Sequence, residues 1–153
     1  MNKTYPFLNT YPTLGERVFI HDMAAVIGKV KLGEDVSVWP MATIRGDVND
    51  IEIGACSNVQ DGAILHVTHD GPYSPGGQAL KIGEGVTIGH KVLLHGCTIK
   101  NYCLIGMGSI VMDNVVIEDY VLLGAGSVVP PGKRLESKSC LLYTSDAADD
   151  TPC

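Results

Sequence analysis

Three of the five histidines, His66, His90 and His95, are candidates for binding one metal ion. Imidazole nitrogens bind zinc at about 2.0–2.1 Å, and three protein ligands leave the fourth position of a catalytic zinc open. Two histidines on neighbouring strands, about 5 Å apart, can share such an ion. The arrangement of the strands that carry these histidines determines whether they can bind one ion.

A repeat of six residues runs through most of the chain. It is interrupted by a three-residue insertion and a longer excursion, and one residue is dropped near its middle. Hexapeptide periodicity predicts a solenoid of triangular cross-section, in which each hexapeptide supplies a short strand and a corner. Three hexapeptides complete a coil of about eighteen residues, and successive coils pair as parallel strands. The inward aliphatic positions are Ile20, Val26, Leu32, Val38, Ile44, Ile53, Val59, Leu65, Ile82, Ile88, Leu94, Ile99, Ile105, Val111, Ile117, Leu123 and Val129.

The composition agrees with this all-β architecture. There are 18 glycines but only 2 phenylalanines and 1 tryptophan, as expected for tight corners and a core of β-branched residues. An ordinary β-sandwich would instead show alternation of period two and hairpin turns.

Charge and cysteine usage exclude several classes of function. A net charge of −6 gives no reason to expect a nucleic-acid partner, and no apolar run is long enough to span a membrane. The five cysteines are odd in number and form no Cys-x-x-Cys pair, so neither a disulfide framework nor a thiolate zinc site is indicated. The first residues carry no apolar targeting segment, and a cytoplasmic location is expected.

The repeat also predicts which side chains stack. Residues three hexapeptides apart lie on the same face of neighbouring coils, provided that the breaker-rich segment at about 70–80 forms an external loop. On this count Arg45, His66 and His95 occupy one column, because each follows an inward aliphatic residue. His90 falls on the next face. It can join the other two histidines only if another chain supplies it.

Three motifs in this repeat resemble the γ-class carbonic anhydrases. They are residues 44–47 (IRGD), residues 58–62 (NVQDG) followed by Leu65 and His66, and residues 89–96 (GHKVLLHG). The motifs occur in order, and the resemblance covers roughly residues 10–135. It implies a left-handed parallel β-helix that associates as a homotrimer.

The resemblance also implies a metal and a reaction. His66 and His95 of one subunit and His90 of its neighbour would hold zinc (iron or cobalt in some members), and the reaction would be the reversible hydration of carbon dioxide to bicarbonate. Gln60 would orient solvent at the metal. Arg45 and Asp47 resemble an interface pair of the family, completed by Asp61 of an adjoining subunit.

One position departs from the family pattern. Val48 stands where an acidic proton shuttle follows the Arg-Gly-Asp motif, and His69 or an acid of the 70–80 loop is a conjectural substitute. Two alternatives therefore remain open. One is a hexapeptide acyltransferase that uses a histidine as general base, although such an enzyme does not need two stacked histidines. The other is a non-catalytic metal-binding trimer.

The sequence divides into a β-helix over 1–137 and an anomalous tail over 138–153. The tail has no hexapeptide frame and resembles translated adapter sequence joined to a truncated reading frame. We interpret it as non-native, in place of the C-terminal helix that the family carries.

Overall fold

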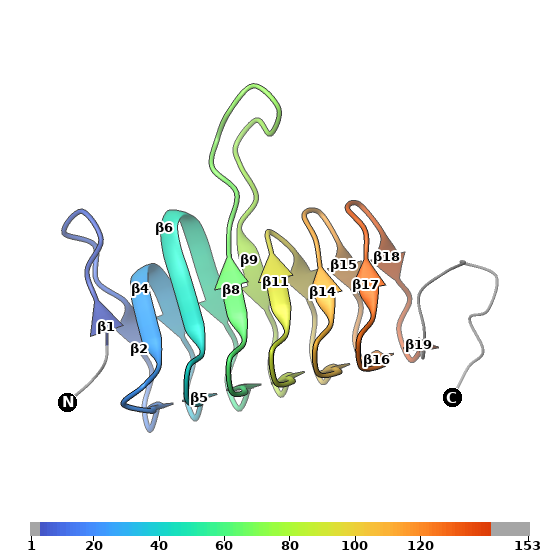
Figure 1. Cartoon of the computed structure of the whole chain (residues 1–153), viewed down its shortest axis with the longest axis horizontal. Helices are drawn as coiled ribbons and strands as arrows, with labels where there is room; N and C mark the ends of the chain where they lie inside the picture. The colour runs from blue at the N-terminus through green and yellow to red at the C-terminus, as the bar shows by residue number, and fades with distance from the viewer. Residues whose placement is uncertain (1–3, 142–153) are drawn as a thin grey trace.

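The structure, a computed structural model, describes residues 4–141, which form strands and turns and no helix. Nothing in that range is therefore a helix long and apolar enough to cross a membrane. Figure 1 shows coils stacked side by side along one long axis. Most of the strands are only two or three residues long. The strands are β1 (Thr4–Tyr5), β2 (Thr13–Leu14), β3 (Phe19–Ile20), β4 (Ala25–Leu32), β5 (Ser37–Val38), β6 (Thr43–Ile53), β7 (Asn58–Val59), β8 (Ile64–His66), β9 (Leu80–Ile82), β10 (Thr87–Ile88), β11 (Leu93–His95), β12 (Thr98–Ile99), β13 (Leu104–Ile105), β14 (Ile110–Val111), β15 (Val116–Ile117), β16 (Leu122–Leu123), β17 (Val128–Val129), β18 (Arg134–Leu135) and β19 (Cys140–Leu141).

The strands form three faces. Face one contains β1, β8, β11, β14, β17 and the first halves of β4 and β6; face three contains β2, β9, β12, β15, β18 and the second halves of the same two strands. Face two is a separate seven-stranded sheet in the order β19-β16-β13-β10-β7-β5-β3. Every pair of strands is parallel, which confirms the predicted parallel β-helix.

The core is the column of aliphatic side chains that the repeat predicts. All the predicted inward positions are buried except Ile20, which is partly buried at the N-terminal end. Smaller inward residues such as Ala42, Ala63 and Cys97 occupy the corners. Because burial of each Val, Leu or Ile side chain contributes about 1.5–3 kcal/mol, this continuous column holds successive coils in register.

The register places the two stacked histidines as predicted. Leu94 pairs with Leu65, and His95 pairs with His66, at the ends of β11 and β8. Leu65 in turn pairs with Ile44 on β6, one coil away. The inward leucines therefore set the positions of the two outward imidazoles.

The three-residue insertion forms a bulge in β6. Gly46 pairs with Gly28 of β4, and the ladder resumes only at Ile51, opposite Val30. The backbone passes so close to β4 that a Cβ added at Gly46 would lie 2.5 Å from the carbonyl oxygen of Lys29. Glycine is needed there for this close approach, and the bulge carries the next residue, Asp47, toward the histidines.

The longer excursion is an external loop between β8 and β9, which rises well above the coils in Figure 1. An antiparallel bridge between Thr68 and Gln78 closes its base, with both N–H···O distances at 3.0 Å. The Asn49 amide in the β6 bulge donates to the carbonyl oxygen of Thr68 at 3.1 Å. The loop base is thus fixed beside the stacked histidines.

The coil extends beyond the boundary at 137 that we placed from the sequence. Leu141 of β19 pairs with Leu123, and it lies one six-residue step after the buried Leu135. An aliphatic residue at this spacing continues the core, so the six-residue frame reaches into residues 138–141. Residues 142–153 lie outside the described part of the chain, and the non-native origin of the tail stays a prediction.

Two inward thiols should be far less reactive than an exposed one. Burial raises the pKa of the Cys97 thiol to about 12, and burial also raises the pKa of Cys103, whereas Cys56 is exposed. Compared with a thiol of ordinary pKa, near 8.5, Cys97 at pH 8 has about a thousandfold less thiolate, the reactive form. We expect iodoacetamide to label Cys56 and spare Cys97 in the folded protein, as measured by peptide mass spectrometry. Equal labelling of both would contradict the packing.

Candidate metal centre

The side chains of His66 and His95 lie on face one with their rings turned toward each other. The Nδ1 atom of His66 is 3.0 Å from the Nε2 atom of His95, and the ring centroids are 5.0 Å apart. Two nitrogen ligands of a tetrahedral zinc ion lie about 3.3–3.4 Å apart at ordinary bond lengths. The pair is therefore spaced nearly as two ligands of one ion would be.

The outer nitrogens of both rings contact carboxylates. His66 Nε2 lies 2.9 Å from Asp47 Oδ1, and His95 Nδ1 lies 2.7 Å from Asp113 Oδ1. An ionised carboxylate only accepts hydrogen bonds, so each ring donates its N–H outward. When both rings are neutral, the two nitrogens that face each other both present lone pairs. A cation between them would turn this repulsion into coordination, and a carboxylate behind each imidazole is the usual support of metal-binding histidines.

Asp47 is held in its charged form. Burial raises the pKa of Asp47, but the hydrogen bond from His66, a backbone hydrogen bond and the nearby Arg45 guanidinium together bring it below its usual range. Arg45 also forms an ion pair with Asp47. Asp47 therefore stays ionised throughout the neutral pH range. It accepts a hydrogen bond from His66 and links the Arg45 guanidinium to the stacked pair.

The remaining predicted residues lie across the corner, at the ends of the face-two strands. His90 Nδ1 contacts Asp61 Oδ2 at 3.2 Å, and both side chains are about half exposed. The Gln60 amide donates to Asn58 Oδ1 at 2.8 Å. Within residues 4–141 of one chain, no three His, Cys, Asp or Glu side chains gather as a metal site. For a metal site shared between chains, one chain would offer a pair half-site (His66 and His95) and a single half-site (His90).

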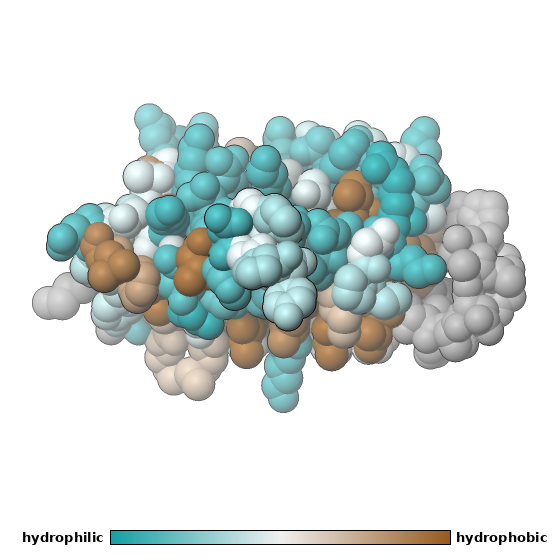
Figure 2. Space-filling view, turned by 90° about the horizontal axis from the view of Figure 1, so that it is seen from above, coloured by the Kyte–Doolittle hydropathy of each residue, from teal (hydrophilic) through white to brown (hydrophobic). Residues whose placement is uncertain are grey.

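The single half-site borders an apolar depression of about 450 Å³. Leu104, Met107 and Leu122 line it, and each of these side chains is at least 39% exposed. Figure 2 shows the molecule from above. Apolar surface gathers along the lower edge of the picture, and most of the remaining visible surface is hydrophilic. Exposed apolar surface beside a polar group is typical of an interaction site.

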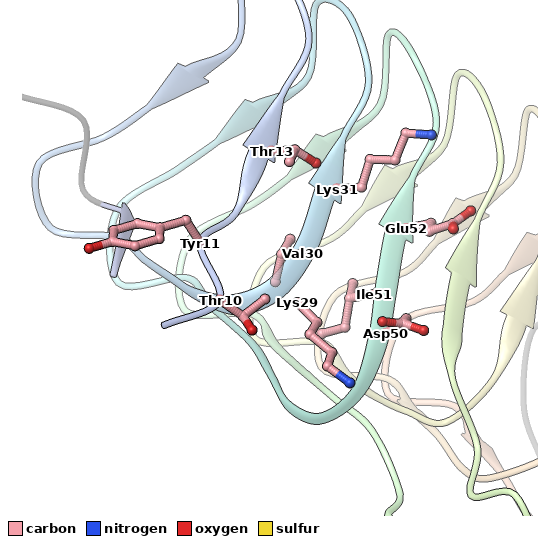
Figure 3. Close-up of a pocket in the computed structure, with 9 residues that line it drawn as sticks. All are labelled: Thr10, Tyr11, Thr13, Lys29, Val30, Lys31, Asp50, Ile51 and Glu52. Atoms are coloured by element: carbon pink, nitrogen blue, oxygen red, sulfur yellow. The ribbon is translucent and has the colours of Figure 1, made fainter. Parts of the chain in front are cut away.

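A second depression, of about 230 Å³, lies at the N-terminal end of the solenoid and is drawn in Figure 3. Charges of both signs line it, from Lys29 and Lys31 on β4 and from Asp50 and Glu52 on β6. It contains no histidine or cysteine. Its side chains therefore offer no imidazole or thiolate ligand for a transition metal.

Asp113 is the contact that we did not anticipate from the sequence. It follows Val111 by two residues, and Val111 pairs with Leu94 of the coil that carries His95. An acidic residue one coil beyond a candidate ligand, near the same phase of the repeat, was the signal that could have revealed it.

Comparisons with known proteins agree with this architecture. The model of the bacterial transferase hexapeptide family (six repeats) matches residues 96–131. Protein YrdA of Escherichia coli is 59% identical over 132 residues, which is 86% of this chain and 72% of that protein. A carbonic anhydrase of Geobacillus kaustophilus is 40% identical over 109 residues, covering 71% of this chain and 56% of the relative.

Among solved structures, a hexapeptide transferase family protein from Anaplasma phagocytophilum matches with a TM-score of 0.80 and 38% identity, over 90% of this chain and 76% of that one. Fold and repeat together define a hexapeptide-repeat β-helix protein. The chain belongs to the hexapeptide-repeat family and is similar over part of its length to a protein named carbonic anhydrase.

Proposed function

We propose that this protein is a cytoplasmic, metal-dependent enzyme of carbonic anhydrase type. In this proposal a homotrimer hydrates carbon dioxide reversibly at zinc sites between its subunits. His66 and His95 of one subunit and His90 of the partner subunit hold each ion. The observation that carries the proposal is the pair of imidazole nitrogens 3.0 Å apart, each ring held from behind by a carboxylate. The relative named carbonic anhydrase supports it.

The metal and the surrounding side chains would each contribute to the hydration reaction. Zinc held by three imidazoles lowers the pKa of a coordinated water to about 7 and so supplies a nucleophile at neutral pH. Asp47 holds the ring of His66 in the ligating orientation. The amide of Gln60 orients solvent and substrate from the single half-site. Arg45 and Asp47, with Asp61 of the partner subunit, set the register between chains.

Proton removal should limit the rate. Hydration releases a proton that must reach buffer, and Val48 at the usual shuttle position has no titratable group. Val48 is 44% exposed, so buffer molecules have access to this part of the surface. The hydration rate should therefore rise with the concentration of imidazole buffer.

The deciding experiment combines metal analysis with a rate measurement. Protein purified without added chelator should contain one zinc, iron or cobalt ion per chain by mass spectrometry, and stopped-flow assays should show hydration of carbon dioxide that His90→Ala removes. His21→Ala is the matched control, because among residues 4–141 the only hydrogen bond of the His21 imidazole is with the Met23 backbone N–H. A protein without a stoichiometric transition metal would overturn the proposal.

An acyltransferase is the second candidate, favoured by one observation. The apolar depression beside His90 is large enough for part of an acyl donor. The matching Anaplasma structure, named as a hexapeptide transferase family protein, is consistent with this candidate. In that case the metal-stripped protein should bind coenzyme A, and the bound coenzyme A should protect Met107 from oxidation. A metal-loaded trimer that catalyses neither reaction would support the non-catalytic alternative.

A further inference from the structure

We infer that Asp113 is a positioning residue of the metal centre, which keeps the Nε2 atom of His95 directed at His66. The inference rests on the proposed function, because it assigns a role toward the metal that those histidines would hold. Asp113 comes from the corner after β14, one coil beyond His95. It lies outside the three motifs that carry the family resemblance.

Both carboxylate oxygens of Asp113 are engaged at the site. Oδ1 lies 2.7 Å from His95 Nδ1, and Oδ2 accepts a hydrogen bond of 2.8 Å from the Thr68 hydroxyl. The same hydroxyl oxygen lies 3.4 Å from His95 Nδ1. A short bond to an ionised acceptor fixes the proton of His95 on Nδ1, which leaves Nε2 as the donor atom for a metal.

The backbone leaves room for this contact. Gly96 follows His95 with a φ of +50°, and a Cβ added there would lie 2.4 Å from Asp113 Oδ1 and 2.8 Å from Gln78 Cβ. Any larger residue would push the carboxylate away from His95. The absence of a side chain at position 96 is therefore an independent sign that the fold accommodates this carboxylate.

Asp113 differs from Asp47 in its partners. Asp47 shares its charge between His66 and the Arg45 guanidinium. In the described part of the chain the polar partners of Asp113 are His95 and Thr68, and no lysine or arginine forms an ion pair with it. The negative charge of Asp113 thus acts mainly on His95, where it strengthens the imidazole as a ligand. Thr68 also connects this carboxylate to the base of the external loop.

The test measures zinc affinity and the His95 tautomer in the full chain. Zinc dissociation constants are obtained by competition with a chromophoric chelator for the wild type, Asp113→Ala and Asp113→Asn. Asp113→Ala should weaken zinc binding about 10- to 100-fold, the usual effect of losing the partner of a ligating histidine. Asp113→Asn, which keeps an acceptor oxygen but not the charge, should give a smaller loss. Asp22→Asn removes the same charge beside β3, at the N-terminal end of the solenoid, and should change nothing.

The tautomer measurement needs no metal. Nitrogen-15 NMR of the metal-free protein should show His95 protonated at Nδ1 in the wild type and a mixture of tautomers in Asp113→Ala. Zinc affinity within twofold of wild type in both Asp113 variants would overturn the inference. If the wild type binds no zinc, the proposed function fails, and an unchanged tautomer would then separately overturn the role of Asp113. If Asp113→Ala loses its circular dichroism spectrum, Asp113→Asn carries the test.

Discussion

His95→Ala should remove stoichiometric metal and carbon dioxide hydration while the β-helix stays folded. Loss of an outer partner alone weakens metal binding about 10- to 100-fold, so loss of a ligand should cost more than about 100-fold. The fold should survive because the His95 side chain is one-third exposed and points away from the aliphatic core. Metal content by mass spectrometry and hydration by stopped flow measure the two effects.

His21→Ala is the comparison for that variant. It also deletes an imidazole from the end of a short strand, but on face two and beside Met23. The two variants should have similar thermal midpoints and differ only in metal content and rate. A His95→Ala protein that still holds one metal ion per chain would exclude the stacked pair as ligands.

Two inactive variants from opposite half-sites should restore activity when they are mixed. His90→Ala lacks the single half-site, and His95→Ala lacks a ligand of the pair half-site. In a cyclic trimer each site joins the pair of one chain to the His90 of the next. Random assembly of equal amounts then makes about one site in four intact, so co-refolded mixtures should reach about a quarter of wild-type activity.

A mixture of His66→Ala and His95→Ala gives the control for this experiment. Both changes fall in the pair half-site, on adjacent strands β8 and β11 of one chain. No combination of such subunits contains an intact pair, so the mixture should stay inactive. Recovery in this control, or none in the first mixture, would show that the site is not shared between subunits in this way.

The sequence predicted the stacked pair because a solenoid converts spacing into position. Once the inward aliphatic residues are counted, Leu65 and Leu94 must pair, and His66 and His95 follow them outward. The same logic explains why His90 stands apart, since it follows a strand of another face. The position of the backbone alone determines on which face and in which coil each histidine lies, and the six-residue repeat predicts that position directly.

The repeat does not predict which neighbouring residues a side chain contacts. Asp47 contacts His66 because a bulge after Gly46 displaces it, and the repeat shows only that residues are inserted there. Asp113 contacts His95 from a corner, two residues past its inward valine, where the direction of a side chain depends on local turn geometry and on the space above Gly96. The continuation through Leu141 is hard to predict for a different reason, because the residues between Leu135 and Leu141 are mainly polar and hide the six-residue step.

The external loop gives the protein a place where its length can change. It leaves one face directly after His66 and returns on another at Leu80, so extra residues at its tip alter neither the pairing of β8 with β11 nor the coil that follows. Doubling a loop costs only about 0.6 kcal/mol in closure entropy. The tip, where Tyr73 is fully exposed, is therefore a suitable point for inserting a peptide tag, a fluorescent reporter or a whole second domain without disturbing the stacked histidines.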